Sequence, residues 1–331
     1  MKNFNKYQAI SMLAIVMSCG FIACNDDDEN YEAPTESKIT LGNTGLRVSQ
    51  VGSTVFEFEK GKLVEFGYYD DYEDRWVVSD NSTKMHFGYS ESKYYTSADI
   101  TNISYNKNGY VTSFKMRWIE SYSNGEEEEN DSYKCSYDSD GHLTKITCSW
   151  SGYYDDYGER IKFSGSSTQN ITWKNGRIIY SKYDGTEKED GEIYKWGDTY
   201  DFSYDGDVTK NPLLQPSRAL EYTFQLDDLS ELVYIGYFGV GSSYFPSSCK
   251  REEYEEGDYD DYYDEWENNY TVSLNSDNTI NRENYDYYYE YVNSSSKTRA
   301  PQVIVSESTE RPKTPTIHSN RHHGRKHRVN K

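Results

Sequence analysis

Hydrophobic and polar residues alternate in two segments of the chain, each of which follows a glycine turn. After Gly109 the sequence reads YVTSFKMRW, and after Gly141 it reads HLTKITCSW. Successive side chains of a strand point to opposite faces, so the pattern predicts antiparallel strands with one buried and one solvated face. The predicted buried face comprises Tyr110, Thr112, Phe114, Met116 and Trp118 in the first segment and His142, Thr144, Ile146, Cys148 and Trp150 in the second. The predicted solvated face of the first segment comprises Ser113, Lys115 and Arg117.

The two segments are copies of an internal repeat. Residues 102–118 and 134–150 align with an offset of 32 residues and share Ser, Tyr, Gly, Thr and Trp in register. Asn-Gly and Asp-Gly supply the positive φ angles of a tight hairpin turn, so each copy predicts one β-hairpin. Weaker copies lie at 56–66, 171–180 and 202–208, and degenerate copies without the turn glycine lie at 222–234 and 270–285. Seven hairpins predict about 14 strands.

Longer acidic, tyrosine-rich segments connect the other ends of these strands. Short turns at one end and long loops at the other predict an all-β, antiparallel up-and-down meander over residues 41–293. A sheet of about 14 strands tends to curl, and closure removes its unpaired edges, so we expect a closed or nearly closed barrel. An open or twin-sheet meander is the alternative.

Composition and charge exclude several other classes of protein. The chain has 35 Tyr and 6 Trp, large side chains that fill a core while keeping one polar atom in water, and only 7 Pro. Tyrosine favours strands, which argues against a helical bundle or a polytopic helical membrane protein. The formal net charge of −21 argues against a nucleic-acid partner, because phosphate contacts need a cationic surface.

The N-terminus has the organisation of a lipoprotein signal peptide, residues 1–24. Lys2 and Lys6 precede a mostly apolar run over residues 9–23, which is too short to span a bilayer. The run ends in FIAC, which resembles the lipobox of bacterial lipoproteins, and a weaker match, VMSC, precedes it. The resemblance implies that Cys24 receives a lipid, which would hold the chain to a membrane without a spanning segment.

An acidic cluster follows the lipobox directly. It consists of Asp26, Asp27, Asp28 and Glu29. The cluster resembles the export signal of surface lipoproteins in the Bacteroidota, which implies a lipid-anchored protein of the outer membrane that faces the extracellular side. A solvated acidic tether is the alternative, and we interpret residues 25–40 as a flexible tether in either case.

The C-terminal segment, residues 294–331, differs from the rest of the chain. It contains nine Lys and Arg against two Glu, a net charge of +7, whereas the remainder is strongly acidic. We interpret it as a disordered basic tail. An arm that pairs with acidic loops or with anionic polysaccharide is the alternative. Its histidines match no closed metal site; they are His318, His322, His323 and His327.

The sequence offers little catalytic chemistry. It contains no GxSxG, HExxH or P-loop motif, and outside the tail only His86 and His142 remain, which we interpret as surface imidazoles. We therefore assign no catalytic residue and no metal ligand, and we predict that the protein is not an enzyme. The acidic run at 258–265 offers the oxygen ligands that Ca²⁺ prefers but lacks EF-hand spacing, so no cofactor is assigned.

Two tryptophans are the candidate ligand-binding residues. Trp76 and Trp266 lie beside acidic loops, where flat aromatic faces would be open to sugar rings. The tryptophans of the alternating strands are expected in the core instead. Cys135 and Cys148 lie ~13 Å out of register across their predicted hairpin, at ~3.3 Å per residue, so we predict buried thiols rather than a disulfide.

The lipobox, the acidic leader and the Tyr-Asp-x-Asp-Gly hairpins together resemble a Bacteroidota lipoprotein family of unknown function with a porin-like fold, over residues 50–292. The stretch YDSDGHL at 137–143 is also similar to the YD repeat of large shell-forming secreted proteins. A lipid-facing band requires every second residue to be apolar over about ten residues, and Lys115, Arg117 and Lys145 interrupt it. We therefore expect a soluble barrel that is tethered to the membrane, with its apolar face inward.

The predicted function is binding of glycan or another extracellular macromolecule at the acidic loop end. A structural protein of the cell envelope without a small ligand is the first alternative. A carboxylate-dependent glycan hydrolase is the second, because abundant carboxylates supply many pairs of acids.

Overall fold

The computed structural model describes residues 41, 45–68, 75–79, 82–91, 94–122, 125–156, 158–206, 208–256, 262–284 and 287–293. The predicted lipidation site at Cys24, the acidic cluster at 26–29, the tether and the basic tail lie outside these residues. None of the helices in the described ranges has the length and apolarity needed to cross a membrane.

The described residues contain seventeen strands and two short helices. The first nine strands are β1 (Leu46–Val51), β2 (Thr54–Glu59), β3 (Lys62–Tyr68), β4 (Arg75–Ser79), β5 (Lys84–Glu91), β6 (Tyr94–Tyr105), β7 (Val111–Tyr122), β8 (Gly125–Tyr137) and β9 (Leu143–Asp156). Then follow β10 (Glu159–Lys174), β11 (Arg177–Glu189), β12 (Glu192–Ser203), α1 (Arg218–Thr223), the 3-10 helix η2 (Asp227–Val233), β13 (Ser248–Glu256), β14 (Tyr262–Asn269), β15 (Val272–Leu274), β16 (Ile280–Glu283) and β17 (Tyr287–Asn293).

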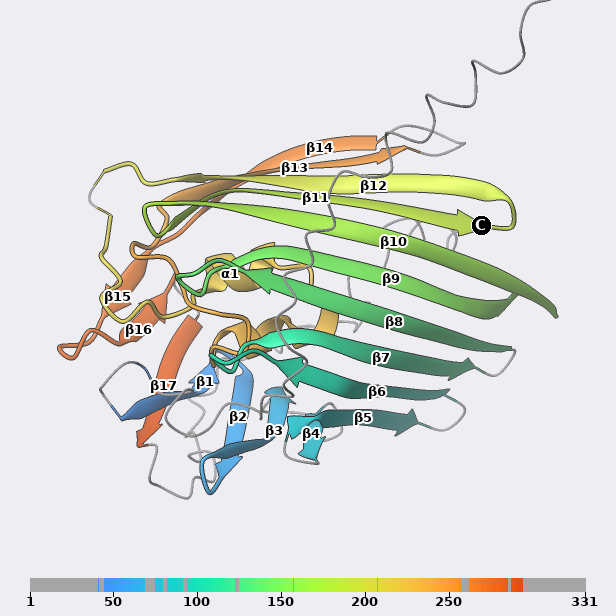
Figure 1. Cartoon of the computed structure of the whole chain (residues 1–331), viewed down its shortest axis with the longest axis horizontal. Helices are drawn as coiled ribbons and strands as arrows, with labels where there is room; N and C mark the ends of the chain where they lie inside the picture. The colour runs from blue at the N-terminus through green and yellow to red at the C-terminus, as the bar shows by residue number, and fades with distance from the viewer. Residues whose placement is uncertain are drawn as a thin grey trace, which may run out of the picture. The chain divides into compact units, whose positions relative to one another are not determined.

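The strands form one antiparallel up-and-down meander, as predicted. Each strand from β1 to β14 pairs with its neighbours in sequence, and β15, β16 and β17 continue the pattern. In addition, β1 pairs with β17, so the two ends of the meander lie side by side. Figure 1 shows the long strands β6–β12 running next to one another.

The predicted closure of the sheet into a barrel is wrong for the described residues. No ladder joins β14 to β15 there, although the two strands are separated by only two residues. The backbone N–H of Tyr270 donates to Ser247, and that of Asn284 donates to the carbonyl oxygen of Thr271, each at 2.8 Å. These two linking residues therefore bond to segments on either side instead of forming a reversing turn.

The two faces of the sheet differ as the alternation predicts. In β7, Phe114, Met116 and Trp118 are 2–3% exposed, whereas Lys115 and Arg117 are exposed. Cys135 and Cys148 are buried and form no disulfide, as predicted, although Cys135 lies opposite Ile146, two residues from Cys148, so the offset is smaller than the predicted ~13 Å. Burial raises the pKa of the Cys135 thiol to about 12, which keeps it protonated.

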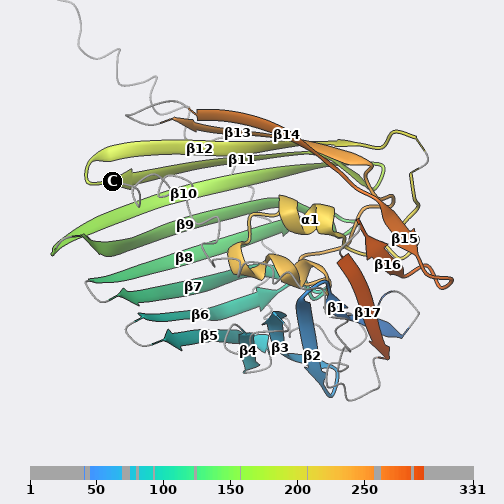
Figure 2. The same ribbon diagram turned by 180° about the vertical axis from the view of Figure 1, so that it is seen from behind.

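One predicted hairpin is replaced by helix. Residues 222–234 contain the end of α1 and all of η2, and these helices lie against one face of the long strands (Figure 2). The reason is the spacing of its apolar residues, since Leu226, Leu229 and Leu232 recur every three residues and are all buried. The other degenerate copy, 270–285, forms the predicted hairpin as β15 and β16.

Buried polar groups hold this helical segment on the sheet. The Gln169 side chain of β10 donates to the carbonyl oxygen of Thr223 at 2.6 Å and accepts from the backbone N–H of Gln225 at 3.0 Å. At the start of α1, the carboxylate of Glu283 accepts from the backbone N–H of Arg218 at 2.8 Å. Burial raises the pKa of Glu283 to about 7.

Adjacent hairpins are tied together at their short-turn end by a repeated contact, which we call the turn clasp. The first residue after the turn glycine packs on an aromatic side chain at the end of the next strand. That aromatic side chain donates a hydrogen bond to the carbonyl oxygen of the second residue after the same glycine. The packed pairs are Tyr110 on Tyr137 (5.3 Å between ring centroids), His142 on Trp173 (4.2 Å) and the Arg177 guanidinium over Tyr204 (5.2 Å). The hydrogen bonds run from Tyr137 to Val111 (2.6 Å), from Trp173 to Leu143 (2.8 Å) and from Tyr204 to Ile178 (2.9 Å).

The clasp explains why an aromatic residue precedes each turn in the repeat. Tyr137, Trp173 and Tyr204 each stand before the turn glycine of their own hairpin and close the clasp of the preceding one. The 32-residue pattern therefore specifies contacts between hairpins as well as the turns themselves.

Candidate functional site

Trp76, one of the two predicted ligand-binding residues, lies in the core. It is 6% exposed and its ring stacks at 6.1 Å on Phe66 and lies 5.6 Å from Phe87. These rings belong to a row that crosses β2, β3, β4, β5 and β7 and ends at Trp118, 5.9 Å from Phe87. The prediction that Trp76 opens a face to a ligand is wrong, because its neighbours in the row cover the ring.

Trp266, the other predicted residue, is half-buried on β14. The guanidinium of Arg251 lies over its ring, 4.4 Å from the centroid. Arg251 also donates to Asp198 at 2.8 Å from Nε and lies 2.7 Å from it through Nη2. The tryptophan therefore borders an ion pair between the half-buried Arg251 and the buried Asp198, on the apolar side of the sheet.

A polar groove runs over the opposite, solvated side of β6–β11. It consists of two hollows of about 610 and 640 Å³ that share Asn130 and Ser151. Small polar side chains form its floor: Thr101, Asn130, Ser132, Ser149, Ser151 and Ser164. Longer side chains line the hollows as well, among them Lys115, Arg117, Glu128, Tyr153 and Lys162.

Ion pairs fix one wall of this groove. Arg117 binds Glu128 through two hydrogen bonds of 3.0 Å each, and Asn130 donates to the same carboxylate at 3.1 Å. Hydrogen bonds from Arg117 and Asn130 lower the pKa of Glu128, and the hydrogen bond to Glu128 raises the pKa of Arg117. Both side chains are therefore charged at neutral pH and held in a planar, bidentate geometry.

A second set of contacts fixes the aromatic residue of the groove. The Tyr153 hydroxyl donates to Glu126 at 2.6 Å, which raises the pKa of the tyrosine. The Arg160 guanidinium lies over the Tyr153 ring at 3.8 Å and binds Asp155 at 2.8 and 3.2 Å. The ring is thus held in one orientation before any ligand arrives.

The groove therefore offers what a polyhydroxylated ligand needs. Its hydroxyl, amide and charged groups donate and accept hydrogen bonds, and one fixed aromatic ring lies among them. Sequence reasoning missed the groove because its floor comes from separate strands, each contributing only one or two small residues. The one available signal was the run of serines on the polar side of the strands.

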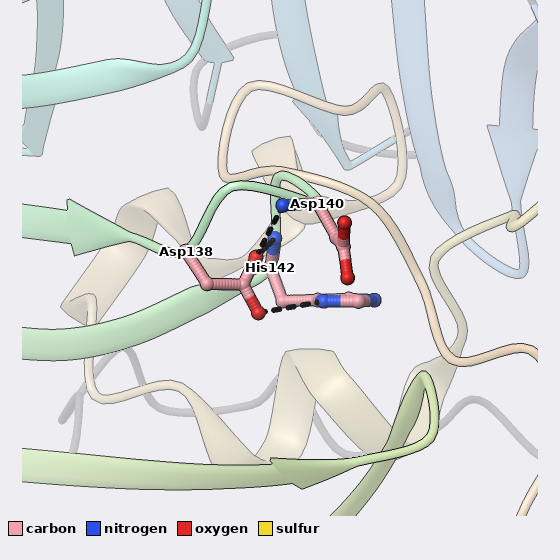
Figure 3. A group of neighbouring side chains, drawn as sticks. All are labelled: Asp138, Asp140 and His142. Carbon is pink, nitrogen blue, oxygen red and sulfur yellow. Dashed lines mark hydrogen bonds and ion pairs between the residues drawn. The ribbon is translucent and has the colours of Figure 1, made fainter.

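The structure also brings together three side chains at the β8–β9 turn: Asp138, Asp140 and His142 (Figure 3). In the described part of the chain they form the one group of three or more His, Cys, Asp and Glu side chains placed to hold a metal ion. His142 is 4% exposed, which confirms its place on the predicted buried face and shows that its interpretation as a surface imidazole is wrong. His86 is on the surface as predicted, 2.8 Å from Asp99. Of the acidic run at 258–265, to which no cofactor is assigned, residues 258–261 lie outside the described residues.

Neither a family model nor a curated protein matches the chain. A porin-like protein from Bacteroides vulgatus is similar over 74% of this chain and 96% of its own, with 13% identity and a TM-score of 0.40. A porin-like protein from Bacteroides uniformis is similar over 63% of this chain and 95% of its own, with 13% identity and a TM-score of 0.21. The strand pairing of this chain by itself establishes the all-β, antiparallel fold class.

Proposed function

We propose that this protein is a non-enzymatic surface lipoprotein of the outer membrane that binds glycan, or another extracellular macromolecule rich in hydroxyl groups, through the groove over β6–β11. The observation that carries the proposal is the pre-formed polar groove on the solvated face of the sheet. The lipid anchor at Cys24 and the surface display are proposed from the leader sequence.

The polarity of this face supports a site in water. Lys115, Arg117 and Lys162 stand on it, and such cations are costly on a surface that meets lipid chains. The groove is also already ordered by its own ion pairs, so a ligand would lose little free energy in arranging side chains.

The experiment is a glycan array followed by calorimetry with the best polysaccharide, using the full chain and Tyr153→Ala. Tyr263→Ala is the matched control, because Tyr263 is 62% exposed on β14 and outside the groove. The proposal expects binding that Tyr153→Ala weakens at least tenfold and that Tyr263→Ala leaves unchanged. Binding that is lost only in Trp266→Ala would place the ligand on the other side of the sheet, and no binding at all would favour a structural role in the envelope.

Anchoring and display are tested separately in cells. Cys24→Ser is expected to abolish metabolic labelling with a radioactive fatty acid. Replacing the four acids at 26–29 with alanine is expected to leave the lipid in place but to protect the protein from protease added to intact cells. Labelling of Cys24→Ser, or full protease sensitivity without the acids, would contradict the respective part of the proposal.

A further inference from the structure

The turn between β8 and β9 presents a carboxylate oxygen in a fixed position. One oxygen of Asp138, Oδ1, accepts the backbone N–H groups of Asp140 at 3.0 Å and His142 at 2.9 Å. These bonds and Gly141, whose φ is +91°, define the turn. The other oxygen, Oδ2, is left facing Nδ1 of His142 at 2.9 Å (Figure 3).

The imidazole is held just as firmly. His142 is 4% exposed, and its ring stacks on Trp173 with 4.2 Å between centroids and 21° between planes. Among the described residues its hydrogen bonds run only to Asp138, and Nε2 has no partner there. Histidines that bind metal ions are commonly held in one orientation by neighbouring groups, and this imidazole is held so beside two carboxylates.

We propose that Asp138, Asp140 and His142 bind a divalent first-row transition ion, for which Zn²⁺ is the probe. One ligand atom from each residue lies within 4.8 Å of the others. Two ligands at about 2.0–2.2 Å from one tetrahedral ion lie about 3.4 Å apart, so Asp138 Oδ2 and His142 Nδ1, now 2.9 Å apart, need to separate by only about 0.5 Å to admit it. Imidazole favours such ions over Ca²⁺ and Mg²⁺, which prefer oxygen alone.

The ion would take the place of the proton between Asp138 and His142. Binding therefore competes with protons and weakens as the pH falls. It would also offset the repulsion between the two carboxylates. The same turn also accepts a hydrogen bond from the segment that follows η2, from the N–H of Val240 to the carbonyl oxygen of Gly141 at 3.1 Å, so a bound ion would stiffen this contact.

The preceding turn, between β6 and β7, is an internal control. Asn106 Oδ1 accepts the backbone N–H groups of Asn108 at 2.9 Å and Tyr110 at 3.1 Å, as Asp138 does for its own turn. Gly109 has a φ of +81°. The same turn therefore forms with two amides and a phenol, and its geometry does not require the two acids and the imidazole.

The test compares the full chain with a variant whose second turn copies the first: Asp138→Asn, Asp140→Asn and His142→Tyr. In both proteins the tail histidines are replaced by glutamine, because they compete for the metal; they are His318, His322, His323 and His327. Zn²⁺ is titrated by calorimetry and Co²⁺ by its visible absorption, with circular dichroism as the check on folding. Asp138→Asn alone is the conservative second variant, since it keeps the oxygen that forms the turn.

The proposal expects one equivalent of Zn²⁺ in the parent protein, at least tenfold weaker binding in Asp138→Asn, and no binding at this site in the triple variant. It also expects Mg²⁺ and Ca²⁺ to bind at least tenfold more weakly than Zn²⁺. Equal Zn²⁺ binding in the parent and the triple variant, no binding in the parent, or tighter binding of Ca²⁺ than of Zn²⁺ in the parent would overturn it.

Discussion

The turns β6–β7 and β8–β9 share one backbone arrangement and differ in chemistry. In both, an oxygen of the first side chain accepts two backbone N–H groups, and a glycine with positive φ completes the turn. In both, the residue after the glycine packs in a turn clasp. The first turn has neutral amides and a phenol, and the second has two acids and an imidazole. In the same few residues, the atoms that form the turn are therefore different from the atoms that could bind a ligand.

The largest expected effect comes from removing the clasp of the second turn. Trp173→Ala deletes the ring under His142 and the donor to Leu143, and we expect a loss of about 3 kcal/mol in the free energy of unfolding. Urea denaturation measures it. Tyr263→Ala, on an exposed ring, is the control and is expected to change stability by less than about 0.5 kcal/mol. A loss for Trp173→Ala as small as the control's would show that the clasp contributes nothing.

The next effect concerns the crowding of the second turn by the first. A Cβ at Gly141 would lie 3.0 Å from the Tyr110 ring, and its φ of +91° is strained for alanine. We expect Gly141→Ala to cost about 2 kcal/mol. Gly191→Ala isolates the strain, because its φ is +92° with nothing within 4 Å, and is expected to cost about 1 kcal/mol. If Gly141→Ala and Gly191→Ala lose the same stability in thermal and urea unfolding, the contact with Tyr110 adds nothing to the cost of the backbone strain.

A smaller effect measures the hydrogen bond of the first clasp. Tyr137→Phe keeps the ring against Tyr110 but removes the donor to the carbonyl oxygen of Val111. We expect a loss of about 1 kcal/mol. Tyr288→Phe, on a ring that is 54% exposed, is expected to be neutral. If both variants are equally stable, the packing of the rings rather than the hydrogen bond holds the clasp.

The smallest effect distinguishes the two turns by pH. Burial pushes the pKa of Asp138 upward, but hydrogen bonds from His142 and from the backbone outweigh it, and the net pKa is lowered. A depressed carboxyl pKa contributes stability that is present above the unfolded value, about 3.9, and is lost as the pH falls through the folded value. We expect Asp138→Asn to flatten the decline in stability below pH 4, by a few tenths of a kcal/mol. Asn106→Asp is expected to steepen this decline. If the unchanged protein, Asp138→Asn and Asn106→Asp all show the same dependence of stability on pH, the lowered pKa of Asp138 does not contribute to stability.

Much of the fold could be predicted from the sequence because strands and turns are local. Alternation placed Phe114, Met116 and Trp118 on one face and Lys115 and Arg117 on the other, and the glycines marked the turns. The helical segment was mispredicted as a hairpin because a weak match to the repeat was weighted above apolar spacing of three. Trp76 was misplaced because a tryptophan beside a loop looks the same in sequence whether other rings cover it or not.

The sequence by itself determined the period of the meander, which side of the strands is apolar and which is polar, and the oxygen that shapes each turn, since these depend on residues within a few positions of one another. Only the tertiary structure decided that the sheet stays open at β14 and β15, that six small side chains from separate strands form one groove, and that Trp173 buries His142. The physical reason is that such features arise from side chains far apart along the chain, whose meeting depends on the twist and register of every strand between them.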